Sequence, residues 1–433
     1  MASDLKPMAG YPEWSLEQQG LEAQIKQILR ETFALHGFPE LNTRTQEPIS
    51  HLASEGDDKE IMTVGRHGDD SEASLGLRFD LTVPFARYVA QNVDALPLPF
   101  GRYTIGSAWR GERPQFGRYR EFTQADFDVV ARGSLPISFD GQIVALLAEA
   151  MTKLPIPPVL ISINNRKILQ GAYEALEIND VNATLRVVDK LRKIGADGVI
   201  KALIDIGVGE AAARTCVDIA EIKGDPGDVQ QRLGRLNLRS DQLDEGLNEL
   251  VSAYESVPKE FQSRLLCNLE IARGLAYYTG LVIEGYFEHD TTGFGAVCSG
   301  GRYENLVAKF DPSLQLPGVG ASIGVTRIMG YLTREGAPEA SPVPRANPAV
   351  VLLALENEDV RARATEIAQR LRSRGIATMV SPDSPKWGGQ IGNATKRGLP
   401  YVVFVKADGL EVRNLETREQ AEFDPDTWLP AGS

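Results

Sequence analysis

The sequence predicts an α+β protein with an antiparallel sheet and flanking helices, a helical insertion, and a separate C-terminal α/β domain. Three observations predict it: aromatic and β-branched runs broken by glycines between residues 77 and 130, charge-rich helical periodicity between 180 and 254, and strands that alternate with helices after a proline-rich stretch. A length of 433 residues is sufficient for two or three domains.

An amphipathic helix is expected at the start of the chain. Ser15 and Gln18 form a capping-box pattern, and apolar residues then recur at helical spacing until Gly37, which can end the helix. From Leu77 to Val130, glycines separate short runs that are typical of antiparallel strands joined by hairpin loops. We therefore predict a sheet in this segment.

The remaining segments divide the chain into domains. Apolar residues at helical spacing from about residue 180 to 254 predict a small helical insertion, and a strand pattern returns near residues 275–284. Residues 336–348 concentrate proline, alanine and serine without periodicity, which predicts a linker. We therefore expect one domain over residues 1–335 and a small α/β domain with a largely parallel sheet over residues 349–433.

Composition excludes several classes of protein. The apolar runs fall far short of the ~20 residues that a membrane span needs, and the N-terminus has no secretory pattern, so we expect a cytoplasmic protein without a membrane partner. The 3 cysteines are widely separated, and the 4 histidines show no metal-ligand spacing. We expect no disulfide framework, no zinc and no metal held by protein side chains.

The net charge of −13 argues against unspecific coating of nucleic acid. Between Arg361 and Arg397, however, eight basic residues stand against Glu366 and Asp383. This stretch is either a local face for RNA or a solvated helix surface, and spacing alone does not decide between them.

Glycine loops of the usual nucleotide-binding kinds are absent, and the Gly318–Gly324 segment GVGASIG is only a near match. Guanidinium groups can hold phosphates instead, because their planar forks match phosphate oxygens and keep their charge. The Arg102–Glu121 segment holds five arginines against two glutamates, with glycine and proline between them. It is either a phosphate-binding loop or a surface hairpin with solvated charges.

The order of residues in this segment resembles a known family. WRGERPQFGRYREFTQADFD resembles the second signature motif of class II aminoacyl-tRNA synthetases, in the form used by histidyl-tRNA synthetases. Further segments resemble the same family in the same chain order: LRFDLTVPFARYVAQN its amino-acid-binding strand, ARGLAYYTGLVIE and CSGGRYENL the segments of the histidine branch, GVGASIGVTRIMGYL the third class II motif, and GGQIGNATKRGLPYVVFV with VRNLETREQ the anticodon-binding domain. The resemblance implies a class II catalytic domain followed by an anticodon-binding α/β domain.

Two positions depart from the family pattern. The first class II motif usually carries Thr-Pro where this chain has Thr43-Arg44, which puts in doubt the dimer-forming helix and strand near residues 40–51. Ala276 stands where most relatives carry aspartate, which puts local packing in doubt more than activity.

The resemblance implies an ATP-dependent reaction in which an amino-acid carboxylate attacks the α-phosphate, with magnesium carried by the phosphates. Such a transfer mostly requires alignment and positive charge. By resemblance, Arg110 holds the α-phosphate, Arg327 the γ-phosphate end and Glu112 the adenine side, while Phe122 offers a face to the adenine ring. Arg273 would lie between the carboxylate and the α-phosphate and reduce their repulsion.

Histidine is the amino acid that the resemblance implies. Its neutral ring presents one donor and one acceptor, for which Asp128 and Tyr278 are the candidate partners, while Asp80, Thr82 and Gln124 would hold the α-amino group. Neighbouring residues of a strand face opposite sides, so Tyr277 and Tyr278 do not both face the substrate, and the sequence leaves open which one does. Asp80 and Asp128 also have a structural alternative, as strand-end carboxylates that cap backbone donors.

The family implies a homodimer and tRNA(His) as a partner, with Lys396 and Arg397 as candidate RNA contacts. Two other functions remain as alternatives: a catalytically silent, histidine-binding paralogue that regulates ATP phosphoribosyltransferase, and an RNA-binding sensor of uncharged tRNA. The presence of Arg110, Arg273 and Arg327 argues against the first alternative. The sequence has no kinase-like or basic extra segment of the kind that the second would carry.

Overall fold

The computed structural model describes residues 5–53, 60–68, 73–271, 278–334 and 345–430. The chain divides into two compact units, one made of residues 1–13 and 24–341 and the other of residues 14–23 and 342–433. Antiparallel strands with helices in the first unit, and an α/β arrangement in the second, confirm the α+β class. The exact domain bounds predicted above stay a proposal.

Helix α1 (Leu16–Leu35) forms where the capping box predicts it. The backbone N–H of Gln18 donates to Ser15 Oγ at 3.3 Å, and the Ser15 N–H donates to Gln18 Oε1 at 2.9 Å. Gly37 follows the helix with φ +80°, a conformation that favours glycine. The buried stripe of α1 ends at Phe33, whose ring packs on Tyr103 and Phe127 of the large sheet.

The large sheet of the first unit has the strand order β4-β5-β11-β10-β9-β6-β8-β7 among the described residues. Neighbouring strands are antiparallel except β6 and β8. The strands are β4 (Phe100–Trp109), β5 (Glu121–Val130), β6 (Val159–Asn165), β7 (Lys223–Gly224), β8 (Leu265–Asn268), β9 (Tyr278–Phe287), β10 (Cys298–Tyr303) and β11 (Gly318–Gly324). The prediction of antiparallel strands near residues 100–130 is confirmed.

Part of the strand prediction between residues 77 and 130 is wrong. Strand β3 (Leu75–Leu77) ends early, and residues 82–92 form helix α3 (Thr82–Asn92). Val83, Ala86 and Val89 are buried at helical spacing, and the Asp80 carboxylate accepts a hydrogen bond from the Val83 N–H at 3.1 Å. The segment thus has a helical period and a side-chain cap, which its β-branched composition conceals.

A small antiparallel sheet, β1-β3-β2, precedes α3 and contains β1 (Gln46–Pro48), β2 (Thr63–Val64) and β3, with helix α2 (Ile49–Leu52) after β1. Arg44, which departs from the family pattern, has a partner here: its Nη2 lies 2.6 Å from Oε2 of Glu47, whose side chain is 1% exposed. Arg87 of α3 contacts the other oxygen of Glu47 at 2.8 Å. The two arginines hold the pKa of Glu47 below its usual range despite burial.

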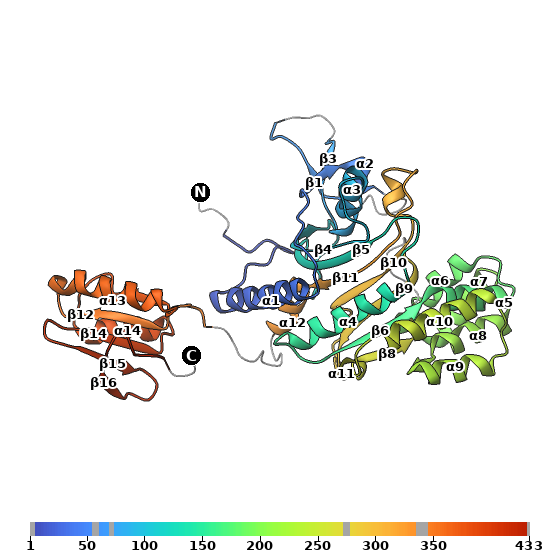
Figure 1. Cartoon of the computed structure of the whole chain (residues 1–433). Coiled ribbons are helices and arrows are strands. Elements are labelled where there is room, and N and C mark those ends of the chain that lie inside the picture. The colour runs from blue at the N-terminus through green and yellow to red at the C-terminus, as the bar shows by residue number, and fades with distance from the viewer. Residues whose placement is uncertain (1–4, 54–59, 69–72, 272–277, 335–344, 431–433) are drawn as a thin grey trace. The chain divides into compact units, whose positions relative to one another are not determined.

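The remaining helices of the first unit either pack against the large sheet or belong to the helical insertion. Helix α4 (Ser138–Lys153) and helix α12 (Val325–Leu332) pack against the large sheet. The region between β6 and β8 is almost entirely helical and lies beside the β6 and β8 end of the sheet (Figure 1). It contains α5 (Arg166–Ala175), α6 (Val181–Val188), α7 (Leu191–Asp205), α8 (Glu210–Ala220), α9 (Pro226–Arg235), α10 (Asp241–Glu255) and α11 (Lys259–Gln262).

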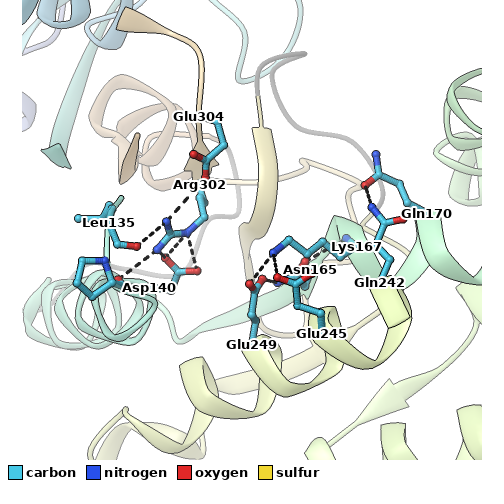
Figure 2. Close-up of polar contacts among 11 residues, drawn as sticks. Leu135, Asp140, Asn165, Lys167, Gln170, Gln242, Glu245, Glu249, Arg302 and Glu304 are labelled. Atoms are coloured by element: carbon cyan, nitrogen blue, oxygen red, sulfur yellow. Dashed lines mark hydrogen bonds and ion pairs between the residues drawn. The ribbon is translucent and has the colours of Figure 1, made fainter. Parts of the chain in front are cut away.

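Polar side chains fasten this helical region to the sheet (Figure 2). Asn165, the last residue of β6, caps α5 and donates to Glu249 of α10 at 2.7 Å, while Lys167 donates to Glu249 at 2.6 Å. Elsewhere in the same view, the buried Arg302 of β10 pairs with Asp140 of α4 at 2.7 Å. These contacts hold β6 and β10 to the neighbouring helices.

The second unit is a five-stranded sheet with the order β13-β12-β14-β15-β16, of which the first three strands are parallel. Its elements are β12 (Val351–Leu355), α13 (Arg361–Ser373), β13 (Thr378–Val380), α14 (Trp387–Lys396), β14 (Tyr401–Val405), β15 (Leu410–Asn414) and β16 (Gln420–Glu422). Alternate residues of β12 pack with residues of α13 and of α14, so the two helices cover opposite faces. The predicted helix and strands of this segment are confirmed.

Candidate functional site

A cavity of about 1160 Å³ lies over the face of the large sheet opposite α1. On β5 the side chains of Phe127 and Ala125 face the helix side, and those of Gln124, Asp126 and Asp128 line the cavity. Every predicted site residue of the catalytic unit that the structure describes lines this cavity: Asp80, Thr82, Arg110, Glu112, Phe122, Gln124, Asp128, Tyr278 and Arg327. Arg273 and Tyr277, like Ala276, lie outside the described residues.

One end of the cavity is acidic. Asp80, Asp126 and Asp128 are each no more than 3% exposed. Asp80 uses one carboxylate oxygen to cap α3, as expected if its role is to cap backbone donors. Its second carboxylate oxygen is not used in this cap. Burial raises the pKa of Asp80 to about 6 and that of Asp126 to about 7. Asp126 was missed in the sequence analysis, although it stands two residues from both Gln124 and Asp128 on one strand face.

Two buried arginines interact with these carboxyl groups. Arg102 of β4 is fully buried, and its Nη2 lies 2.8 Å from Asp128 Oδ2 as an ion pair, although not along a hydrogen-bond direction. Asp128 Oδ1 accepts from the Tyr303 hydroxyl at 3.2 Å. Arg78 donates to the backbone carbonyls of Ser107 and Thr43 at 2.8 and 3.0 Å. Arg110 also interacts electrostatically with Asp80, so three cations stand against the three aspartates when all are ionised.

The sequence analysis counted Arg102 among the five arginines of a candidate phosphate-binding loop. In the structure, Arg102 instead pairs with Asp128 and is not available to a phosphate. Its guanidinium lies 4.3 Å from the Phe85 ring centroid and donates to the Leu81 carbonyl at 3.0 Å. It neutralises Asp128 at the acidic end of the cavity.

Glycine at position 320 creates the space for Asp128. A Cβ at Gly320 would collide with Asp128 Oδ1, because the two residues face each other across β11 and β5. This close approach explains the glycine at position 320 in the near match to a nucleotide-binding loop. The chain needs a residue without a side chain here, so that the Asp128 carboxylate can lie beside it.

The other end of the cavity is basic. Arg110 donates to the Phe79 carbonyl at 3.2 Å, and its guanidinium carbon lies 5.2 Å from the centroid of the Phe122 ring. Arg327 of α12 donates to the carbonyls of Phe294 and Gly117. Burial, together with Arg118 nearby, lowers the pKa of Arg327 to about 10. Cations held close together in this way favour a polyanionic ligand, which relieves their repulsion.

Glu112 lies at this basic end, 3.6 Å from Arg118 Nη1. Phe294 was not predicted: its ring packs on Phe116 and Tyr331, and Arg327 lies 4.9 Å from its centroid. No motif in the sequence analysis included Phe294, so only the fold brings it to the site.

The helical region contributes a third side of the cavity. Arg166, Arg186 and Arg192 line it together with Glu284 and Tyr286 of β9. Arg166 donates to the Tyr278 carbonyl at 2.7 Å, and Tyr278 itself lines the cavity and packs on the core around Val83 and Tyr303. The acidic end, the basic end and the side from the helical region therefore enclose one continuous space.

Comparisons with known proteins agree with this arrangement. The family model of histidyl-tRNA synthetase matches residues 11–328, and that of the anticodon binding domain matches residues 349–429. The histidine–tRNA ligase of Thermobifida fusca is 43% identical to this chain, with 98% of this chain and 97% of that protein covered. The corresponding protein of Cutibacterium acnes is 42% identical, with 98% and 96% covered.

The chain belongs to the histidyl-tRNA synthetase family. Among solved structures, the histidyl-tRNA synthetase from Nostoc sp. PCC 7120 has a TM-score of 0.88 and 30% identity, covering 98% of this chain and 97% of that one. A protein described as an ATP phosphoribosyltransferase regulatory subunit/histidyl-tRNA synthetase from Bacillus halodurans C has a TM-score of 0.74 at 19% identity, with 93% of this chain and 99% of that one covered, which shows the fold alone.

The described part of this family member contains no group of three or more histidine, cysteine, aspartate or glutamate side chains placed to hold a metal ion. In the same residues, no helix is both long enough and apolar enough to span a bilayer.

The predicted RNA contacts lie at the end of α14 in the anticodon-binding domain. Lys396 and Arg397 are exposed, and Arg397 donates to Asn393 Oδ1 at 2.6 Å next to the helix C-terminus. Other arginines of the basic stretch are bound within the domain: Arg370 pairs with Asp426, Arg372 donates to the Thr378 carbonyl, and Arg374 donates to the Pro425 carbonyl. The solvated-surface interpretation therefore fits these three better than an RNA face does.

Proposed function

We propose that this chain is a histidine–tRNA ligase that activates histidine with ATP and transfers it to the 3′ end of tRNA(His). The observation that carries the proposal is the single cavity that has buried carboxylates at one end and Arg110 and Arg327 at the other. A cationic amino group and a polyphosphate fit these two ends, and membership of the family supports the assignment.

In this proposal, Asp80, Thr82 and Gln124 bind the α-amino group, and Asp128 and Tyr278 bind the imidazole. Asp128 suits a ring N–H because its Oδ2 has no hydrogen-bond donor among the residues that the structure describes, although an arginine neutralises it. Of the two tyrosines, we propose Tyr278 as the residue that contacts the imidazole, because its side chain lines the cavity. A role for Tyr277 remains a prediction from the resemblance alone.

At the basic end, we propose that Arg110 holds the α-phosphate, Arg327 the γ-phosphate end, Glu112 the adenine side, and Phe122 the adenine ring. Magnesium arrives with the ATP phosphates. Arg273 is proposed, from the resemblance, to lie between the histidine carboxylate and the α-phosphate, where it would offset the repulsion of two anions.

The test of this activity is histidine-dependent exchange of labelled pyrophosphate into ATP, with each of the other amino acids in parallel. Exchange with histidine well above that with the other amino acids is expected. Exchange at background in folded protein that still binds histidine would favour the regulatory paralogue instead. Sedimentation of the same preparation tests the proposed homodimer, and we place the enzyme in the cytoplasm, where charged tRNA is used.

For tRNA, we propose Lys396 and Arg397 as phosphate contacts. Replacing both with alanine is expected to weaken tRNA binding and to flatten its salt dependence by about one unit for each phosphate that no longer has a cationic partner. Binding should be titrated at several salt concentrations, and the constants for histidine and ATP should stay unchanged.

Arg370→Ala is the matched control for this measurement, because that arginine is also exposed yet is paired with Asp426 inside the domain. Unchanged affinity and slope in the double variant would move the RNA face elsewhere. Lys386, at the other end of α14, would then be the next residue to replace.

A further inference from the structure

Gln124 and Asp126 are joined through a serine on the neighbouring strand. The Gln124 amide Nε2 donates to Ser322 Oγ at 2.8 Å, and the Ser322 hydroxyl donates to the Asp126 carboxylate. These two hydrogen bonds fix the orientation of the Gln124 amide group, so that its Oε1 remains as an acceptor. Ser322 faces Asp126 directly in the register of β11 and β5, which keeps both acceptors at the same place in the cavity.

Four buried acceptor atoms of the acidic end have no hydrogen-bond donor among the described residues: Asp80 Oδ2, Gln124 Oε1, Asp126 Oδ1 and Asp128 Oδ2. Buried acceptors without donors are costly, and proteins keep few of them unless a ligand or water supplies the donors. Histidine with a neutral ring supplies four N–H donors, three from its ammonium group and one from its ring. Its donors thus match these acceptors in number.

We propose that Asp126 is a further substrate-binding residue, which accepts the third hydrogen bond of the substrate ammonium group beside Asp80 and Gln124. The inference rests on the proposed function and adds a specificity determinant to it. The connection through Ser322 assigns Asp126 to the ammonium, because it ties this carboxylate to Gln124 and not to Asp128. Asp128 Oδ2 is then left for the ring N–H.

The charges around Asp126 fit a cationic partner. Arg102 and Arg78 interact electrostatically with it, as do Asp80 and Asp128. Burial is the largest cause that raises the pKa of Asp126 to about 7, so the group is partly protonated near neutral pH. An ammonium group bound against it would lower this pKa, and binding would therefore release protons.

The test compares wild type with Asp126→Asn, which keeps the size of the side chain and removes its charge. Three ligands are titrated: histidine, histidinol, which retains ammonium and ring, and imidazolepropionate, which retains the ring and the carboxylate but lacks the ammonium. Histidine and histidinol are expected to lose about 10- to 100-fold in affinity, because the negative charge that strengthens the hydrogen bond from the ammonium group is removed. Imidazolepropionate should change less than about twofold, which also shows that the variant is folded.

A loss of the same size for all three ligands, or no loss at all, would overturn the proposal. If histidine-dependent pyrophosphate exchange is intact in wild type, such a result removes the role of Asp126 and leaves the proposed function standing. Failure of exchange in wild type would instead remove the proposed function itself.

Proton release provides a second measurement that does not need the variant. Calorimetric titrations near pH 7 in two buffers of different ionisation enthalpy should show more proton release on binding of histidinol than of imidazolepropionate. In Asp126→Asn this difference should shrink, with Asp80 accounting for what remains. Equal proton release for both ligands in wild type would contradict the proposal even if the variant does not fold.

Discussion

Replacement of Arg110 with alanine is expected to lower histidine-dependent pyrophosphate exchange about 10²- to 10³-fold. In the proposed reaction, negative charge grows at the α-phosphate as the carboxylate attacks, and Arg110 is the cation assigned to that position. Its Nε is already held by the Phe79 carbonyl at 3.2 Å, so the guanidinium does not have to be ordered when ATP binds. The loss should appear mainly in kcat, with the KM for histidine within a few-fold of wild type.

Arg132→Ala is the control for this experiment. Arg132 lies two residues after the end of β5, has a 61% exposed side chain, and pairs only loosely with Asp94 at 3.8 Å. Its removal should leave exchange unchanged. If Arg110→Ala raised the KM for histidine and kept kcat, Arg110 would be a residue that positions the amino acid, and the phosphate role would have to move to Arg327.

The sequence predicted residues that line one cavity, because its motifs are contiguous stretches and strand alternation assigns their residues to faces. Gln124 and Asp128 were predicted together and do line one cavity on one strand. Asp126 stands between them on the same face, so the period of two could have found it without any structure. It was missed because the resemblance assigns roles to its neighbours and none to Asp126 itself.

Charge compensation could not be predicted from local sequence. Arg102 lies in the arginine-rich segment, yet β4 turns its side chain to the same sheet face as Asp128, its direct neighbour across the strand pair, where the two form a buried ion pair. Similarly, Arg370, Arg372 and Arg374 form contacts within the anticodon-binding domain with residues up to 56 positions away in the chain. Sequence composition does not show which arginines are free to bind a ligand. The tertiary fold determines which of them already have partners within the protein.

Replacement of Asp128 with alanine is expected to destabilise the first unit by about 3–5 kcal/mol, apart from any effect on histidine binding. The substitution leaves the guanidinium of Arg102 buried without its ion-pair partner, and it removes the acceptor of the Tyr303 hydroxyl. Calorimetric unfolding of the full-length chain measures the effect. The transition of the second unit should not move and serves as the internal reference.

A double variant separates the buried charge from the other consequences of removing Asp128. If the cost of Asp128→Ala comes mainly from the stranded cation, then Asp128→Ala with Arg102→Met should recover much of the stability, because removing both charges leaves neither buried alone. Recovery will be partial, since Arg102 also donates to the Leu81 and Asp126 carbonyls. A loss of stability below about 1 kcal/mol in the single variant would contradict this prediction. Such a result would indicate that Asp126 replaces Asp128 as the counter-charge of Arg102. The unpaired Arg102 would then lower the raised pKa of Asp126, so that its carboxyl group is ionised.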